Sequence, residues 1–333
     1  MSVIAVSRLQ KRFNLEAGFF ARLGRYVNAV NDVSFTIGEH ESYGLVGESG
    51  CGKTTTARLL VRMYEADGGE ILFQDATDVR SLNRRGLKSY REKVKYVFQD
   101  PARSLNPRMS IYDVLVSGRR HSNHWRDTKA RGRDGARRLR EEAAAILQEV
   151  GLSAADLERR PSEFSGGQRQ RISIARGLLM QPRLLICDEV VSALDVSVQG
   201  QILNLLLDLR ERRGLSFLFI AHDLRVACYF CDRIGVMYRG ELMEEAPAAD
   251  LYQRGCHPYT ELLFSSVTGT DLDRGTEAKA AGIPPAGTKA AAAPEGTGCA
   301  FAGRCPLAAE QCVLEHPPLR ETEKGHRVRC FRR

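Results

Sequence analysis

The sequence predicts an α/β fold with a mostly parallel sheet, and two observations support this. Short apolar segments with the length and composition of buried strands recur along the chain: SYGLVG at Ser42, YVFQ at Tyr96, LLICDE at Leu184 and FLFIAH at Phe217. Segments with helical spacing, such as TTARLLVRMY from Thr55, lie between them. Strands that alternate with helices are typical of parallel sheets.

Two regions depart from this alternation. Residues 3–37 alternate apolar and polar side chains around the interruption LEAGFFARLGRY, which predicts an N-terminal antiparallel β subdomain with an inserted loop. Residues from about 100 to 180 have helical spacing, and EEAAAILQEVGL, closed by Gly151, is their clearest amphipathic segment. We expect a helical insertion there, within a core unit that spans residues 1–264.

The end of the chain differs in composition from the core. After Phe264 the periodicity is lost in a stretch rich in Ala, Gly, Thr and Pro, which predicts a linker over residues 265–298. Residues 299–333 then hold four of the nine cysteines. We expect this segment to form a Cys-rich C-terminal extension.

Composition excludes several classes of protein. With 333 residues, 43% hydrophobic and 27% charged, the chain has the make-up of an ordinary globular protein. No apolar run approaches the length that spans a bilayer, and the N-terminus has no secretory signal pattern. We therefore expect a cytoplasmic location, a membrane role only through a partner, and reduced thiols.

The chain is basic, with a net charge of +8. The densest basic run, RDTKARGRDGARRLR at residues 126–140, is compatible with nucleic acid binding or with a solvated helix face. The solvated face is the simpler explanation, and we expect no nucleic acid partner.

A phosphate-binding loop follows the strand SYGLVG. Residues 47–54 match G-x-x-x-x-G-K-[ST] between a strand and a helix, the context that the motif requires. Its glycines allow backbone N–H groups to point inward, and the next helix adds its positive end. The residues expected to bind ATP are Gly47, Glu48, Ser49, Gly50, Cys51, Gly52, Lys53, Thr54 and Thr55.

Acidic residues end the strand LLICDE, at the edge where α/β sheets bind ligands. We expect Thr54 and Asp188 to hold Mg²⁺, and Lys53 to contact the β and γ phosphates. Glu189 is the expected base for the attacking water, and His222, after another strand, is expected to hold phosphate and water in line.

A second glycine-rich turn, FSGGQRQR at residues 164–171, completes a pattern. Together with GESGCGKTT, Gln99, LLICDE, SALD and His222, it resembles the motifs of the ATP-binding cassette (ABC) family, whose core is a P-loop NTPase fold. In that family two cassettes pack head to tail, so the resemblance implies that this turn serves the partner's ATP. Its residues are Ser165, Gly166, Gly167 and Gln168, and a helix N-terminus there suits a γ phosphate.

The resemblance implies roles for four further residues. Asp195 in SALD would lie at the dimer seam, and Gln99 would contact the metal and the attacking water. In this family the adenine base stacks on an aromatic residue before the phosphate loop, which here is Phe13 or Tyr26.

Nearly the whole chain resembles the ATPase subunits of oligopeptide, dipeptide and nickel importers. The likeness rests on FQDPARSLNPRMS, EFSGGQRQRISIARGL, VVSALDVSVQGQILNLL, FIAHDL, HPYTELL and the C-terminal extension. It implies a peripheral subunit at the cytoplasmic face of the membrane, with a second and different cassette subunit. Two transmembrane permease subunits and an extracytoplasmic solute-binding protein would complete the importer.

The extension contains Cys299, Cys305, Cys312 and Cys330, separated by five, six and seventeen residues. Four thiolates suit a [4Fe–4S] cluster, as the resemblance suggests, or tetrahedral Zn²⁺, and a site without metal is the third alternative. Zinc is favoured less because its structural sites more often contain a C-x₂₋₄-C pair.

Two other functions compete with an importer motor. A cassette ATPase that acts on DNA or ribosomes would use the arginine-rich run for recognition. A metal-sensing regulator would depend on the cysteine extension, with ATP hydrolysis secondary. The motor is favoured because the whole set of motifs belongs to one subfamily.

Overall fold

The computed structural model describes residues 1–14, 26–120, 122, 133–267, 297–323 and 325–333. The inserted loop LEAGFFARLGRY lies almost wholly outside these residues, as do most of the expected linker 265–298 and half of the basic run. Within the described residues the strands form two sheets, one of four strands and one of eight.

The smaller sheet is antiparallel and has the strand order β2-β1-β4-β5. Its main pair is the expected hairpin, with Leu9 opposite Val33 in a register that several bulges interrupt. Both of these side chains are fully buried, which explains the alternation in the sequence. The strands are β1 (Ser2–Asn14), β2 (Tyr26–Gly38), β4 (Gly68–Phe73) and β5 (Thr77–Asp78).

The larger sheet has the order β11-β12-β10-β9-β3-β8-β7-β6, and its parallel part runs from β9 to β6. Every residue of β3, β7 and β8 is buried, as expected for strands covered on both faces. The parallel strands are β3 (Ser42–Val46), β6 (Val94–Val97), β7 (Leu184–Asp188), β8 (Ser216–Ala221) and β9 (Arg233–Tyr238).

Two hydrophobic cores lie on the two faces of this sheet. Leu45 and Ile186 belong to the core shared with the small sheet, whereas their neighbours Val46 and Cys187 belong to the core shared with the helical insertion. This division follows from the two-residue period of a strand. The helices outside the insertion are α1 (Lys53–Leu60), α2 (Arg84–Lys93), α8 (Val196–Arg213), α9 (Leu224–Phe230), α10 (Ala248–Arg254) and α11 (Pro258–Val267).

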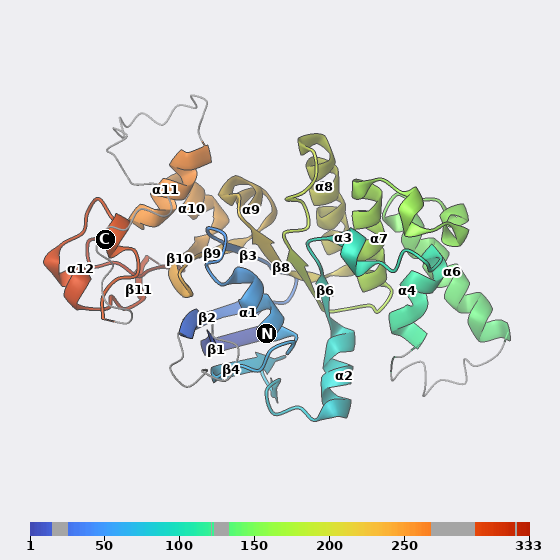
Figure 1. The fold of residues 1–333 in the computed structure, drawn as a ribbon, viewed down its shortest axis with the longest axis horizontal. Coiled ribbons are helices and arrows are strands. Elements are labelled where there is room, and N and C mark those ends of the chain that lie inside the picture. Colours follow the sequence, from blue (N-terminus) through green and yellow to red (C-terminus); the bar gives the residue numbers. More distant parts are fainter. Residues whose placement is uncertain (15–25, 121, 123–132, 268–296, 324) are drawn as a thin grey trace.

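A helical region separates β6 from β7, within the range where the insertion was expected. Its helices are α3 (Pro101–Ser104), α4 (Ile111–Arg120), α6 (Arg133–Glu149) and α7 (Gly166–Leu178), with short 3-10 turns at Ala154–Glu158 and Pro161–Glu163. Figure 1 shows this region at one end of the long axis, residues 297–333 at the other end, and α1 between them.

Residues 297–333, here called the tail, extend the main sheet. The tail contains a 3-10 turn at Ala302–Arg304, α12 (Glu310–Leu314), β11 (Arg320–Glu323) and β12 (His326–Val328). Strand β12 pairs with β10 (Glu241–Pro247), and β10 pairs in turn with β9. The tail therefore adds strands to the same sheet whose strand β3 precedes the phosphate loop.

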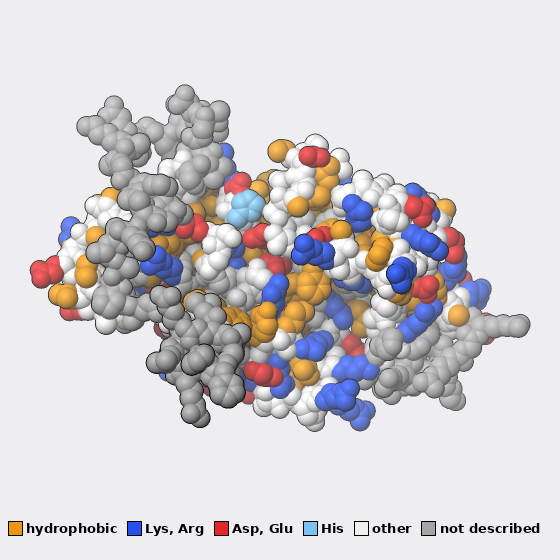
Figure 2. All heavy atoms as spheres, in the orientation of Figure 1, with side chains coloured by type: hydrophobic (Ala, Val, Ile, Leu, Met, Phe, Trp, Pro, Cys, Tyr) orange, Lys and Arg blue, Asp and Glu red, His pale blue; other side chains and the backbone are white. Residues whose placement is uncertain are grey.

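The surface carries its charge in mixed form. On the face drawn in Figure 2, Lys and Arg side chains are spread over the part that holds α2, α3 and α7, and Asp and Glu lie among them. No helix in the described part of the chain is long and apolar enough to cross a membrane.

Candidate functional site

The phosphate loop, residues 47–54, connects β3 to α1 and is pressed between two strands. A Cβ atom at Gly47 would lie 2.1 Å from the carbonyl oxygen of Met237 in β9. At Gly52, where φ is +110°, a Cβ atom would lie 2.2 Å from the carbonyl oxygen of Ala29 in β2. Only glycine fits these two positions, so the spacing of the glycines follows from how closely the loop packs.

The loop combines a buried lysine with the N-terminus of a helix. Lys53 is 4% exposed, and its Nζ donates hydrogen bonds to the carbonyl oxygens of Gly47, at 2.7 Å, and Glu48, at 2.9 Å. Helix α1 begins at this lysine and has no acidic residue in its first turn. A buried ammonium at a helix N-terminus forms a site that suits an anion. Ser49 and Gly50 are exposed beside it, Thr55 is half-buried, and Cys51 is buried.

Thr54 and Asp188 meet at this loop. The Thr54 hydroxyl donates to Asp188 Oδ1 at 2.9 Å, and Asp188 lies at the end of β7. The other carboxylate oxygen, Oδ2, accepts a hydrogen bond from the Tyr96 hydroxyl at 2.5 Å. Burial and the nearby carboxylate raise the pKa of Tyr96, which keeps this hydroxyl protonated. Hydroxyl and carboxylate oxygens are ligands of the kind that Mg²⁺ takes, so the residues fit that ion.

Glu189 and Gln99 also come together. Gln99 Nε2 donates to Glu189 Oε2 at 2.6 Å, and the Glu189 backbone N–H donates to the Ile220 carbonyl of β8 at 3.1 Å. Glu189 has a φ of +48°, a left-handed conformation that is strained for a glutamate and that is often found at functional sites. His222 is exposed directly after β8, the neighbour of β7. These side chains therefore lie together at the carboxyl-terminal ends of the parallel strands.

The turn Ser165–Gln168 lies elsewhere. Ser165 Oγ accepts from the Gln168 N–H at 3.3 Å, and Gln168 Oε1 accepts from the Ser165 N–H at 2.9 Å, which caps α7. Ser165, Gly166 and Gln168 are exposed. Figure 1 shows α7 in the helical region, well apart from α1, so this turn is not part of the chain's own phosphate loop.

The SALD segment lies beside this turn. A Cβ atom at Gly166 would have Leu194 as a neighbour at 3.8 Å, and Asp195 is the exposed N-cap residue of α8. Val196 after it is 85% exposed. The turn and the SALD segment therefore form one exposed surface.

The two aromatic candidates lie at one end of the β1–β2 hairpin. Phe13 is opposite Val27 in the register, and Tyr26 is opposite Asn14. The Phe13 ring packs edge-on against Tyr64, with a centroid separation of 5.3 Å, whereas Tyr26 is 57% exposed.

The four tail cysteines are near one another. The Cys299 N–H donates to the Cys312 carbonyl at 2.8 Å. Burial raises the pKa of the Cys299 thiol to about 11, and Cys312, Cys305 and Cys330 add to the increase. No three of these sulfurs lie within 4.8 Å of one another in the described residues.

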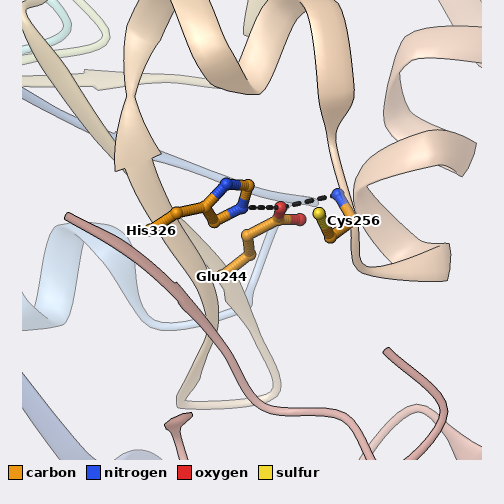
Figure 3. A group of neighbouring side chains, drawn as sticks. All are labelled: Glu244, Cys256 and His326. Atoms are coloured by element: carbon orange, nitrogen blue, oxygen red, sulfur yellow. Dashed lines mark hydrogen bonds and ion pairs between the residues drawn. The ribbon is translucent and has the colours of Figure 1, made fainter. Parts of the chain in front are cut away.

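A different group of donors, Glu244, Cys256 and His326, does lie within 4.8 Å (Figure 3). Glu244 is fully buried, and its carboxylate accepts hydrogen bonds from the backbone N–H groups of Cys256, at 2.7 Å, and His257, at 2.9 Å. His326 Nε2 is 2.7 Å from the same carboxylate. These three partners compensate the buried charge, so the group is a contact that docks the tail on β10.

Sequence reasoning identified Lys53, Thr54, Asp188, Gln99 and Glu189, which the structure brings together. It missed two residues at the site. Tyr96 lies in an apolar strand segment and contacts Asp188, and Arg304 lies among the tail cysteines and pairs with Glu48 of the phosphate loop. Neither local sequence indicates an ATP site.

Two family models match the chain. Residues 30–192 match the ABC transporter family, and residues 243–312 match the oligopeptide/dipeptide transporter C-terminal region. The second match covers α11 and the first part of the tail, up to residue 312.

Full-length relatives agree with these matches. The probable peptide ABC transporter ATP-binding protein y4tS of Sinorhizobium fredii is 41% identical over 99% of this chain and 89% of its own. The oligopeptide transport ATP-binding protein AppF of Bacillus subtilis is 40% identical over 99% of this chain and 97% of its own. A putative peptide import ATP-binding protein of Brucella ovis is 44% identical over 91% of each chain.

Solved structures show the same fold. The ATP-binding cassette MJ0796, in a dimeric post-hydrolysis state with ADP and phosphate, has a TM-score of 0.63 and 25% identity. It covers 74% of this chain and 98% of its own. CbiO1 from Clostridium perfringens, with a TM-score of 0.63 and 23% identity, covers 76% of this chain and 92% of its own. The expected α/β cassette fold is thereby confirmed.

Proposed function

This chain belongs to the ABC transporter family, and from that premise we propose that it is the ATP-hydrolysing subunit of a membrane importer of peptides. The observation that carries the proposal is the meeting of Lys53, Thr54, Asp188, Gln99 and Glu189 at one edge of the sheet. The peptide assignment is supported by relatives at 40 to 44% identity that are named for peptide transport or import.

The chemistry follows from the side chains. Lys53 releases the loop carbonyls to contact the β and γ phosphates, and the backbone of residues 47–55 surrounds them. Thr54, Asp188 and Gln99 would hold Mg²⁺, which would neutralise phosphate charge when bound. Glu189 accepts the proton of the attacking water, and Gln99 orients that carboxylate through the hydrogen bond at 2.6 Å. His222 holds water and phosphate in line, and Phe13 or Tyr26 stacks on adenine.

The assembly follows from what the chain leaves exposed. The turn formed by Ser165, Gly166, Gly167 and Gln168 binds the γ phosphate of the ATP held by a partner cassette. Asp195 lies at the interface between the two cassettes. The exposed surface that the turn forms with the SALD segment supports this arrangement. We assign the partner as a related second subunit, with two permeases and a solute-binding protein, and place this chain at the cytoplasmic face of the membrane.

The tail is assigned a [4Fe–4S] cluster held by Cys299, Cys305, Cys312 and Cys330. The proposal is based on the proximity of the four thiols, because the other three cysteines lie close enough to Cys299 to raise its pKa, and four thiolates suit such a cluster. An absorption spectrum of anaerobically purified protein, with iron and zinc analysis, tests this assignment. Zinc in place of iron, or no metal, would contradict it.

Two substitutions test the ATPase assignment. Lys53→Ala removes the only side-chain cation that the described phosphate loop contains, and we expect ATP affinity to fall at least about tenfold.

Glu189→Gln keeps the hydrogen-bonding shape of the side chain but removes the base, so ATP should still bind while turnover falls at least about 100-fold. Normal turnover in Glu189→Gln would refute the assigned base.

A further inference from the structure

We propose that Arg304 and Tyr259 are positioning residues for the phosphate loop, so that the cysteine-bearing tail forms part of the machinery that binds ATP. Both act on Glu48, the second residue of the loop, one from its side chain and one from its backbone. The inference rests on the proposed function, because it takes this loop to be the ATP site.

Arg304 holds the side chain of Glu48. Its two terminal nitrogens donate to the two carboxylate oxygens, each at 2.9 Å, in a paired geometry that is among the stronger ion pairs. The Arg304 side chain is only 10% exposed and that of Glu48 29%. Such a pair is screened less by water than an ordinary surface pair.

The guanidinium is itself held in place. It lies 5.7 Å from the ring centroids of both Tyr238 and Phe301, a distance at which a cation is attracted to an aromatic ring. Tyr238 is buried in β9, and Phe301 is a fully buried residue of the tail. Arg304 is therefore fixed by packing as well as by its ion pair.

Tyr259 holds the backbone of the same residue. The Glu48 N–H donates to the Tyr259 hydroxyl at 2.9 Å. The Tyr259 ring is fully buried and packs against Tyr238 and Phe301, with centroid separations of 4.7 and 5.3 Å. Glu48 is thus held at both ends by groups that share one aromatic cluster.

The neighbouring His257 ties this cluster to the tail. Its Nδ1 accepts from the Tyr259 N–H at 3.0 Å, and the centroid of its ring lies 5.8 Å from that of Phe301 in the tail. The segment HPY at residues 257–259 therefore links the tail to the phosphate loop.

Holding Glu48 matters for a triphosphate. The Glu48 carbonyl is one of the two that accept hydrogen bonds from Lys53, so the conformation of this residue sets the position of the loop lysine before ATP binds. Its carboxylate is also a negative charge within the loop that is to receive phosphates. Arg304 neutralises that charge, and its loss would leave the carboxylate to repel the ligand.

Arg304 is also tied to the cysteines. It ends the 3-10 turn at Ala302–Arg304, whose first N–H donates to the Cys299 carbonyl at 3.0 Å. Cys305, the next residue, donates its N–H to the Ala302 carbonyl at 3.2 Å. The conformation of the cysteine region therefore determines the position of Arg304. Through Arg304, the tail can change the affinity of the phosphate loop for ATP.

The test is the affinity of the complete chain for a fluorescent ATP analogue with Mg²⁺. Arg304→Met keeps the packing on the two rings but removes the charge, and we expect Kd to rise about tenfold, as for coupled neighbours. Arg333→Ala is the matched control, because Arg333 is a tail arginine whose ion pair with Glu261 is exposed and does not touch the loop. It should bind like wild type.

Positioning has its own signature. In turnover assays KM for ATP should rise in Arg304→Met while kcat at saturating ATP changes less, because the reacting groups are untouched. The exchange Glu48→Arg with Arg304→Glu should recover part of the affinity that each single change loses, which general unfolding would not do.

Three outcomes are decisive. Wild-type affinity in Arg304→Met contradicts the proposal. If that variant does not fold, Tyr259→Phe takes its place, because it removes only the hydroxyl that accepts the Glu48 N–H. Its affinity should fall about threefold, and unchanged affinity would refute the proposal. If Lys53→Ala also binds like wild type, the ATP site itself is wrongly assigned.

Discussion

Single residues at this site were predictable where local sequence determines their neighbours. Lys53 lies next to its own loop, and Asp188 ends an apolar strand, so motif and strand pattern were enough to place them. Tyr96 and Arg304 reach their partners across 92 and 256 residues of chain. The local sequence does not show which distant side chain will form a hydrogen bond or an ion pair with a motif residue.

His257 makes the protein's stability depend on pH. Burial lowers the pKa of His257 from 6.5 to about 4, against the smaller opposing effect of Glu244. The unfolded chain therefore takes up this proton first, and stability that is fully present above pH 6.5 is lost as the pH falls toward 4. The loss should be about 1.4 kcal/mol per pH unit in this range.

The measurement compares urea unfolding of wild type and His257→Gln between about pH 7 and pH 5. The stability difference between the two proteins should shrink as the pH falls. Hydrogen bonding to Glu244 raises the pKa of His326, which gives a dependence of the opposite sign, but both proteins keep that residue. A difference that is constant with pH would show that His257 is not a buried neutral base.

Among the strands, those covered on both faces were predictable from the sequence, and those at the edge of the sheet were not. Strands β3, β7 and β8 are continuous apolar runs because both of their faces are buried. Strand β11 has the sequence RETE and is exposed throughout, so it has no apolar signal. This is why the pattern of apolar residues does not predict that the tail extends the main sheet.

The tail should depend on Phe301 for its docking. This ring is fully buried against Tyr238 and Tyr259, so Phe301→Ala should leave a cavity and cost about 3–5 kcal/mol. Thermal unfolding and limited proteolysis of the tail would measure the loss. Leu314→Ala, at a tail position that is 65% exposed, is the control and should have little effect. Equal behaviour of the two variants would contradict the docking described here.

In the assembled protein, we propose that the turn at Ser165–Gln168 acts on the ATP of another chain. Gly166 is exposed, and its nearest neighbour to an added Cβ atom is Leu194 at 3.8 Å, so Gly166→Asp fits without strain. We expect this variant to bind ATP normally as a single chain. Turnover of the assembled complex should fall at least about tenfold, because a carboxylate would face the partner's γ phosphate.

A loss of ATP binding by the single Gly166→Asp chain would mean that the turn serves the chain's own loop. Comparing binding by the isolated chain with turnover by the complex separates the two arrangements. The motif order predicted this division of labour, but only the fold shows the turn exposed and well apart from α1.

A single preparation can test whether this chain drives a peptide importer. The tagged chain would be purified anaerobically from gently solubilised membranes of its own cells, and its ATPase activity measured with and without peptide and solute-binding protein. We predict two multi-spanning proteins, a second cassette subunit and peptide-stimulated turnover that Glu189→Gln abolishes. Recovery of ribosomes or DNA without membrane proteins would contradict a role in peptide import.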